Sequence, residues 1–319
     1  MDKKFTVFLG DVARDEYYTA EKFPRLGDKV IVRQQETYYG GMIANAACVF
    51  AGYGGDIKFS FALNPRDKDL CDELETHGID TSLVRYDEVL PDSKCIIVLS
   101  DDTHTVLIVT MSDHKLKLTR EIIDEIAKAE TIYSNPFEIK RLECVGEDVS
   151  PADIVKQWAD AGVKIVCDMD VDTVDEEYEP ILKYMDTLFM NDVGFEALTE
   201  HTNGNAVQSL LDAGVKTVVV TLAERGCEIY TEGKKYAVPA VLTDIVDVTG
   251  AGDTFNSTFT FARDLLGDVE DAAVFATYAA SRSIMEMGAR AGNKTIEEVL
   301  EYMEEKGGPA DKFRKLFNK

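Results

Sequence analysis

Short apolar runs alternate with stretches of helical spacing along most of the chain. Apolar runs bounded by glycine or charged residues are typical of strands buried on both faces of a sheet, whereas apolar positions three and four residues apart indicate amphipathic helices. Strands are expected at residues 4–9, 164–167, 187–190 and 217–221. Helices are expected at residues 67–77, 118–129 and 206–213, and the last helix is expected to end at 307–309, before a short basic tail. The alternation predicts an α/β fold with a mainly parallel central sheet, in which ligands bind at the carboxyl ends of the strands.

Two stretches depart from this alternation and predict a second, smaller sheet. Residues 12–39 show little helical spacing and include the β-favouring segment 29–33. Residues 93–100 and 105–110 are apolar and are joined by two aspartates, a pattern typical of a β-hairpin. We therefore expect the two stretches to pair with each other, apart from the main sheet.

One glycine-rich run, Asp247-Val-Thr-Gly-Ala-Gly-Asp253, carries the clearest chemistry, because it stands just before an apolar helical stretch. Successive backbone N–H groups at a helix start form an anion site, and the small residues Gly250, Ala251 and Gly252 let phosphates approach the backbone. A carboxylate beside such a site is costly unless it has a task. The task that fits Asp253 is that of a general base, which takes the proton of an attacking hydroxyl. The alternative is a tight turn with Asp253 as a helix cap.

This run resembles the second signature of the PfkB (ribokinase-like) family of sugar and nucleoside kinases. Two further segments resemble that family in the same order: Gly40-Gly41-Met-Ile-Ala-Asn45 is similar to its first signature, and Val220-Thr221-Leu-Ala-Glu-Arg-Gly226 to its nucleotide segment. The resemblance covers nearly the whole chain. It implies one ribokinase-like domain over residues 1–319, built as a three-layer sandwich. The small sheet, about 12–39 and 93–110, would form a lid over the sugar site, and many relatives also use it to form dimers.

The resemblance also implies a role for each site residue. Asp253 would be the catalytic base, and an anion hole would be formed by Gly250, Ala251 and Gly252. The substrate's hydroxyls would be bound by Asp11, Asp15, Gly40, Gly41 and Asn45. The nucleotide, ATP with Mg²⁺, would be bound by Asn191, Thr221, Ala223 and Gly226. A monovalent cation, K⁺, would be held by backbone oxygens at Asp247, Thr249 and the segment 288–292. The residues themselves support part of this, because Asp11 follows the first strand and Asn45 can both donate to and accept from a diol.

Two positions depart from the family pattern. Ala223 stands where glycine is usual, and Gly194 stands where many relatives carry the glutamate of an N-x-x-E motif, which orients Mg²⁺ through water. Asp192 and Glu196 are nearby acids, but their spacing does not guarantee compensation. The resemblance implies that Asp168 and Asp170 lie at a strand end and face the site. A calcium loop is not expected there, because its sixth position would need glycine and a helix, not a strand, would precede it.

Composition narrows the possible partners. The chain carries 59 acidic and 34 basic residues, a formal net charge of −25, which argues against nucleic acid and anionic membranes as partners. No apolar run approaches the ~20 residues of a membrane span, and the apolar start is too short for a signal peptide. The six cysteines form no C-x-x-C pair. These features predict a cytoplasmic protein with reduced cysteines.

The sequence as a whole predicts an ATP-dependent kinase of a small sugar or sugar derivative, and the resemblance implies a homodimer. The chain contains neither the P-loop pattern G-x-x-x-x-G-K-[ST] nor a dinucleotide fingerprint after its first strand. Two alternatives stay open. A nucleoside kinase would stack a base on lid aromatics such as Tyr17 and Tyr38. A non-catalytic binding or regulatory protein with the same fold is favoured by Gly194 and Ala223, and is disfavoured by Asp253 and its anion hole.

Overall fold

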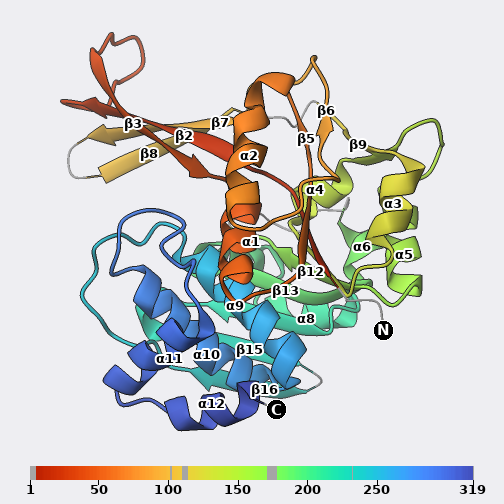
Figure 1. Ribbon diagram of the computed structural model, residues 1–319, viewed down its shortest axis with the longest axis vertical. Helices are drawn as coiled ribbons and strands as arrows, with labels where there is room; N and C mark the ends of the chain where they lie inside the picture. The colour runs from red at the N-terminus through yellow and green to blue at the C-terminus, as the bar shows by residue number, and fades with distance from the viewer. Residues whose placement is uncertain (1–4, 101–102, 110–113, 171–177, 232, 319) are drawn as a thin grey trace.

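An eight-stranded sheet forms the centre of the molecule (Figure 1). The computed structural model describes residues 5–100, 103–109, 114–170, 178–231 and 233–318. The strand order is β16-β15-β14-β13-β12-β10-β1-β4, and all neighbours are parallel except the pairs β14–β15 and β15–β16. The strands are β1 (Thr6–Leu9), β4 (Ile57–Ser60), β10 (Thr131–Ser134), β12 (Lys164–Asp168), β13 (Met185–Asn191), β14 (Thr217–Thr221), β15 (Cys227–Thr231) and β16 (Lys234–Val238). The predicted mainly parallel sheet is confirmed.

The chain reverses its direction across the sheet at β1, because β4 lies on one side of β1 and β10 to β14 follow on the other. Right-handed crossovers in opposite directions place helices on opposite faces. The first crossover carries α1 (Met42–Gly52), which packs beside α9 (Ala251–Leu266), and α9 in turn packs against α10 (Val269–Ser283). The later crossovers carry α5 (Pro151–Asp160), α6 (Glu179–Leu182), α7 (Asp192–His201) and α8 (Ala206–Asp212). Such a reversal is where open α/β sheets bind ligands.

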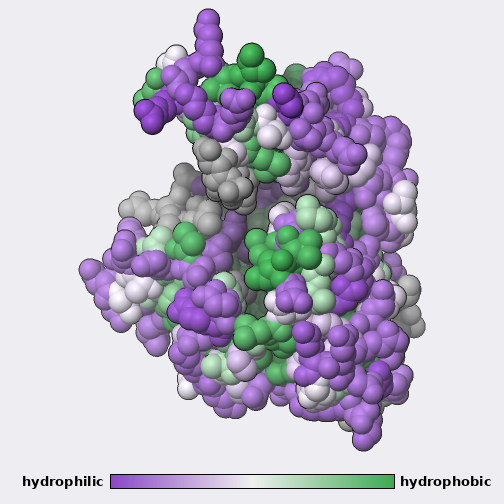
Figure 2. Space-filling model, turned by 90° about the vertical axis from the view of Figure 1, so that its left-hand side faces the viewer, coloured by the Kyte–Doolittle hydropathy of each residue, from purple (hydrophilic) through white to green (hydrophobic). Residues whose placement is uncertain are grey.

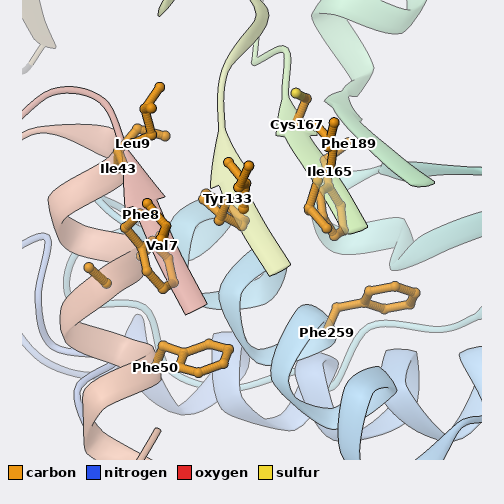
Figure 3. Close-up of a cluster of buried hydrophobic side chains, with 14 of the residues drawn as sticks. Val7, Phe8, Leu9, Ile43, Phe50, Tyr133, Ile165, Cys167, Phe189 and Phe259 are labelled. Carbon is orange, nitrogen blue, oxygen red and sulfur yellow. The ribbon is translucent and has the colours of Figure 1, made fainter. Parts of the chain in front are cut away.

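The core lies between the sheet and its helices. Phe50 of α1 packs edge-on against Phe8 of β1, with ring centroids 5.5 Å apart, and Phe259 of α9 packs in the same manner against Phe189 of β13, also at 5.5 Å (Figure 3). Helices on both faces bury the strands completely, so the central strands are continuous apolar runs rather than alternating ones. The packing fixes α9 against the sheet and thereby sets the position of its first turn.

A separate sheet in the order β3-β2-β7-β8 confirms the predicted pairing of the two unusual stretches. Its strands are β2 (Ala13–Ala20), β3 (Val32–Gly40), β7 (Lys94–Ser100) and β8 (Thr103–Ile108). The predicted strand at 29–33 is mostly wrong, because the ladder between β2 and β3 ends at the pair Ala20–Val32. The turn expected at 101–102 lies outside the described residues. In the space-filling view this small sheet projects at the top and a recess opens beneath it (Figure 2).

Short elements complete the fold. They are β5 (Ala62–Leu63), α2 (Lys68–Thr76), β6 (Arg85–Tyr86), β9 (Leu116–Leu118), α3 (Arg120–Ile126), α4 (Pro136–Lys140), β11 (Leu142–Cys144), α11 (Ile296–Glu305) and α12 (Ala310–Phe317). The prediction that the last helix ends before a basic tail is wrong, because the basic segment after residue 309 itself forms the helix α12. Phe313 of this helix is buried against Phe275, with ring centroids 5.6 Å apart. The six cysteines are free, as predicted. None of the helices in the described chain is long and apolar enough to cross a membrane.

Candidate active site

The first turn of α9 presents its backbone N–H groups at the carboxyl edge of the sheet. Gly250 precedes the helix with φ of 76°, and a Cβ there would overlap the carbonyl oxygen of Ala289. Outside its own stretch of helix, a Cβ on Gly252 would meet no atom of the described residues within 4 Å. Gly250 is therefore glycine because the chain packs closely against it. Gly252 borders open space in the first turn of α9, and the backbone amides and the dipole at a helix start favour an anion.

Asp253 lies in that first turn and contacts a residue from the opposite end of the chain. Asn45 of α1 donates from Nδ2 to Asp253 Oδ2 at 2.9 Å. Burial raises the pKa of Asp253 well above its usual range; the bond from Asn45 opposes this shift, and the charges of Asp168, Asp11 and Asp170 add to it. A carboxylate with a raised pKa is a stronger base than an ordinary aspartate, which suits it to accept a proton from a hydroxyl.

Arg290 fixes the other end of the Asn45 amide, and the sequence did not point to it. Its Nε donates to Asn45 Oδ1 at 3.3 Å, one Nη donates to the backbone oxygen of Gly40 at 3.4 Å, and the other pairs with Glu73 of α2. Because Asn45 Oδ1 accepts from Arg290, its Nδ2 faces Asp253. The sequence predicted a role only for the backbone oxygens of the segment 288–292, as ligands of K⁺. The available signal was an arginine inside a segment expected to border an acidic site.

Replacing Arg290 with methionine is expected to lower kcat/KM about tenfold, since a hydrogen bond to a charged group contributes roughly 1.5–3 kcal/mol. The double variant Arg290→Met/Glu73→Gln avoids an unpaired acid and should show the same loss in steady-state kinetics. Lys294→Met, which removes a cation paired with Glu286 in the same loop, is the control. Full activity in the double variant would show that Asn45 needs no support from Arg290.

The expected substrate residues converge where the small sheet joins the body. Asp11 accepts from the backbone N–H groups of Met42, at 2.9 Å, and Ile43, at 3.4 Å, at the start of α1. A Cβ on Gly40 would displace the carboxylate of Asp15, and Gly41 has φ of 96° with the backbone of Val12 close to it. Burial, with the charge of Asp11, raises the pKa of Asp15 to about 6. The two carboxylates and Asn45 thus form one group of acceptors and donors suited to hydroxyls.

A second group of polar side chains follows β12 and β13. Asp168 is buried and accepts from Asn256 Nδ2 at 2.6 Å and from the Asp170 backbone at 3.0 Å. Asn191 caps α7 through Gly194 N–H, at 2.8 Å, and donates to Asp170 Oδ1, also at 2.8 Å. Asp168 and Asp170 both contribute to the raised pKa of Asp253. The strand-end acids Asp168 and Asp170 therefore lie near Asp253.

Burial raises the pKa of Asp168 to about 6. The folded state then binds this proton more tightly than the unfolded state, so the contribution of Asp168 to the free energy of unfolding is highest at low pH and falls as the pH rises from about 4 to about 6. A shift of this size amounts to about 3 kcal/mol. Asp168→Asn should remove this part of the pH dependence in urea unfolding, whereas Asp160→Asn, at an exposed position on α5, should keep it. Identical profiles for wild type and Asp168→Asn would contradict the assignment.

The expected nucleotide residues lie at the end of β14. Thr221 is its last residue, and Gly226 has φ of 93°, with a Cβ there overlapping the carbonyl oxygen of Val238. Between them Ala223 has φ of 50°. The glycine usual at this position in the family would adopt this left-handed conformation without steric cost. Alanine keeps the turn but strains it.

Ala223→Gly is expected to raise the free energy of unfolding by about 0.5–1 kcal/mol, because relief of the left-handed strain exceeds the entropy that glycine adds to the unfolded chain. Ala213→Gly, at a right-handed position after α8, should have the opposite sign. Chemical denaturation of both variants checks this. Destabilisation by both would mean that Ala223 is not strained.

Asp247 joins the two loops beside the start of α9. Its Oδ1 accepts from the backbone and hydroxyl of Thr249, at 2.9 and 2.7 Å, and its Oδ2 accepts from Gly288 N–H at 2.9 Å. The carboxylate thus holds together the segments whose backbone oxygens were expected to bind K⁺. In the described parts of the chain no three histidine, cysteine, aspartate or glutamate side chains converge as a ready metal cage.

Nearly the whole chain is similar to known sugar kinases. A family model described as pfkB family carbohydrate kinase matches residues 3–296. The ribokinase of Haemophilus influenzae is 25% identical over 315 residues, covering 95% of this chain and 99% of that protein. The ATP-dependent ribose-1-phosphate kinase of Halopiger xanaduensis is 27% identical over 301 residues, covering 93% and 97%. The structure of Arabidopsis thaliana ribokinase complexed with ribose and ATP has a TM-score of 0.80 at 22% identity, covering 95% of this chain and 99% of that one.

Proposed function

Because the chain belongs to the pfkB family of carbohydrate kinases, we propose that it transfers the γ-phosphoryl group of ATP to a hydroxyl of a small sugar or sugar derivative, with Asp253 as the base. The observation that carries this proposal is the contact between Asp253 and Asn45 directly at the start of α9. It brings a carboxylate, a hydroxyl-binding amide and an anion-binding helix start to one point.

The residues divide the reaction among them. Asp11, Asp15 and Asn45 bind the acceptor's hydroxyls, and the backbone at Gly40 and Gly41 lets the sugar lie close to the start of α1. The reacting hydroxyl gives its proton to Asp253 as it attacks phosphorus, and ADP leaves.

The negative charge on the transferring phosphoryl group is stabilised by the backbone amides of Gly250, Ala251, Gly252 and Asp253. Because the helix already orients these amides, they need no rearrangement during the reaction. ATP is bound by Asn191, Thr221, Ala223 and Gly226. Thr221 and Asn191 end neighbouring parallel strands, so they face the same edge of the sheet as Asp11.

Mg²⁺ accompanies ATP in this proposal and neutralises its phosphates. Protein sites for Mg²⁺ commonly supply only one or two carboxylates and leave the remaining positions to phosphates and water. The chain fits this pattern, since Asp170 lies beside Asn191 and acts electrostatically on Asp253. Asp170 would take over the role of the glutamate that Gly194 replaces. This weakens the main argument for a non-catalytic protein.

The test is ADP release from MgATP across ketoses, aldoses, sugar acids, sugar phosphates and nucleosides. We expect one acceptor class to stimulate ADP release by the full chain well above the rate without acceptor. ATP binding without stimulation by any acceptor would favour a non-catalytic binding protein and count against the proposal.

A nucleoside acceptor is the second candidate. Tyr17 and Tyr38 of the small sheet meet edge to face with centroids 5.4 Å apart, and Tyr38 is half exposed. Such rings can stack on a base. Faster turnover of nucleosides than of free sugars in the same panel would select this candidate.

Three lesser features belong to the same proposal. The small sheet, with exposed apolar side chains such as Val106 and Ile108, forms the contact of a homodimer. K⁺ binds at the loops that Asp247 joins. The protein works in the cytoplasm, where its nucleotide is available. Size-exclusion chromatography with light scattering and a comparison of K⁺ with Na⁺ in the assay test the first two.

A further inference from the structure

A second pocket lies away from the candidate active site, between the short strands β6 and β9. Its volume is about 80 Å³, and four of its lining residues carry basic groups: Arg85, His114, Lys115 and Lys117. Among the lining residues that the structure describes, Asp87 is the only acidic one. In a chain with 59 acidic and 34 basic residues, such a concentration of basic groups is unexpected.

The basic groups of this pocket outnumber the carboxylates that the structure describes around it. Elsewhere on the chain basic side chains commonly pair with an acid, as Lys58 does with Glu125 and Arg263 with Asp186. Within the described residues neither Arg85, Lys115 nor Lys117 forms an ion pair. The Asp87 carboxylate instead accepts the backbone N–H of Val89 at 3.1 Å, which closes a local turn. The pocket therefore holds an excess of positive charge.

The backbone around the pocket holds these groups together. Lys115 and Lys117 alternate with the buried Leu116 and Leu118, so both project to the exposed side of β9. The backbone oxygen of His114 accepts from Arg141 Nε at 2.8 Å, and Arg141 is itself buried against Glu138. Like charges held close together cost free energy, and a bound anion would remove that cost.

We propose that this pocket binds a phosphate-type oxyanion, either inorganic phosphate or the phosphate group of a metabolite. Arginine forms paired hydrogen bonds with phosphate and lysine adds point charges, so the side chains match the ligand. The volume is far below the roughly 300–1,000 Å³ of pockets that enclose a whole small molecule. Only the anionic group enters, and the rest of a phosphorylated metabolite stays outside, beside Tyr86. Salt screens the chain's distant negative charge, so it does not prevent binding.

The test is calorimetric titration of the full chain with inorganic phosphate at constant ionic strength in chloride. A saturating non-hydrolysable ATP analogue keeps the start of α9 occupied. The double variant Arg85→Gln/Lys117→Gln should bind phosphate at least about tenfold more weakly, since each hydrogen bond to a charged group is worth roughly 1.5–3 kcal/mol. Lys234→Gln, at an exposed position on β16 outside the pocket, should bind as wild type does. Equal thermal stability in chloride shows that the variants are folded.

A pentose phosphate and ADP are titrated in parallel to find the source of the anion. Equal affinities for phosphate and pentose phosphate, both dependent on Arg85, would identify the phosphate group alone as the ligand. A pentose phosphate or ADP that binds more tightly, with the same dependence, would identify the metabolite. Absence of phosphate binding in wild type, or the same affinity in wild type and the double variant, would overturn the proposal.

Discussion

Asp253→Asn is expected to lower kcat at least ~100-fold, the low end for loss of a general base. The asparagine keeps the shape of the side chain and still accepts from Asn45, so ATP and the acceptor should bind as before. The loss should therefore fall on kcat rather than on KM. Steady-state kinetics with calorimetric ATP binding measure both quantities.

The same variant is expected to be more stable than wild type at neutral pH. The raised pKa of Asp253 means that the folded state disfavours its ionised form, so removing the charge relieves a cost of desolvation. A capping aspartate would behave in the opposite way, because its loss destabilises the helix. If Asp253→Asn kept near-normal turnover, Asp253 would not be the base. If the variant were also less stable than wild type, Asp253 would be a helix cap.

Gly252→Ala is the second large effect, with turnover reduced at least ~100-fold, comparable to the loss of one oxyanion donor. The methyl group would enter open space at the first turn of α9, where the phosphoryl group is expected to pass. The fold should not suffer, since alanine in a helix is favoured over glycine by up to ~1 kcal/mol. Kinetics and thermal unfolding of the same preparation separate the two effects.

Gly250→Ala is the matched comparison, because there the methyl group meets protein instead of open space. The residue has a left-handed conformation and packs on the Ala289 carbonyl, so this variant should lose stability as well as activity. If Gly252→Ala retained full turnover, the open space at the first turn of α9 would not be the path of the phosphoryl group.

Much of the fold could be predicted from the sequence because its signals are local. Continuous apolar runs such as the one before Thr221 occur where a strand is buried on both faces, and the small sheet was visible as a loss of helical spacing. The last helix was missed although Phe313 and Phe317 have helical spacing. Glycines and a proline before it indicated an end, and only packing on Phe275 shows that the chain continues as a helix.

In the candidate site, only the residues that belong to the family motifs could be predicted from the sequence. Asn45 and Asp253 are 208 residues apart and were paired through resemblance, not through local pattern. Arg290 could not be found in this way, because its contacts with Asn45 and Glu73 arise from tertiary packing of a loop. Asp170 was expected near the site, yet its contact with Asn191 depends on a left-handed backbone, with φ of 49°, that nothing in the sequence indicates.

The most direct test of the account is ³¹P NMR of the full chain mixed with MgATP and the acceptor that stimulates ADP release. The account predicts that a phosphomonoester of the acceptor and ADP form in equal amounts, and that neither forms with Asp253→Asn. ADP with only inorganic phosphate would contradict it, because the γ-phosphoryl group would then have passed to water instead of the hydroxyl held beside Asp253.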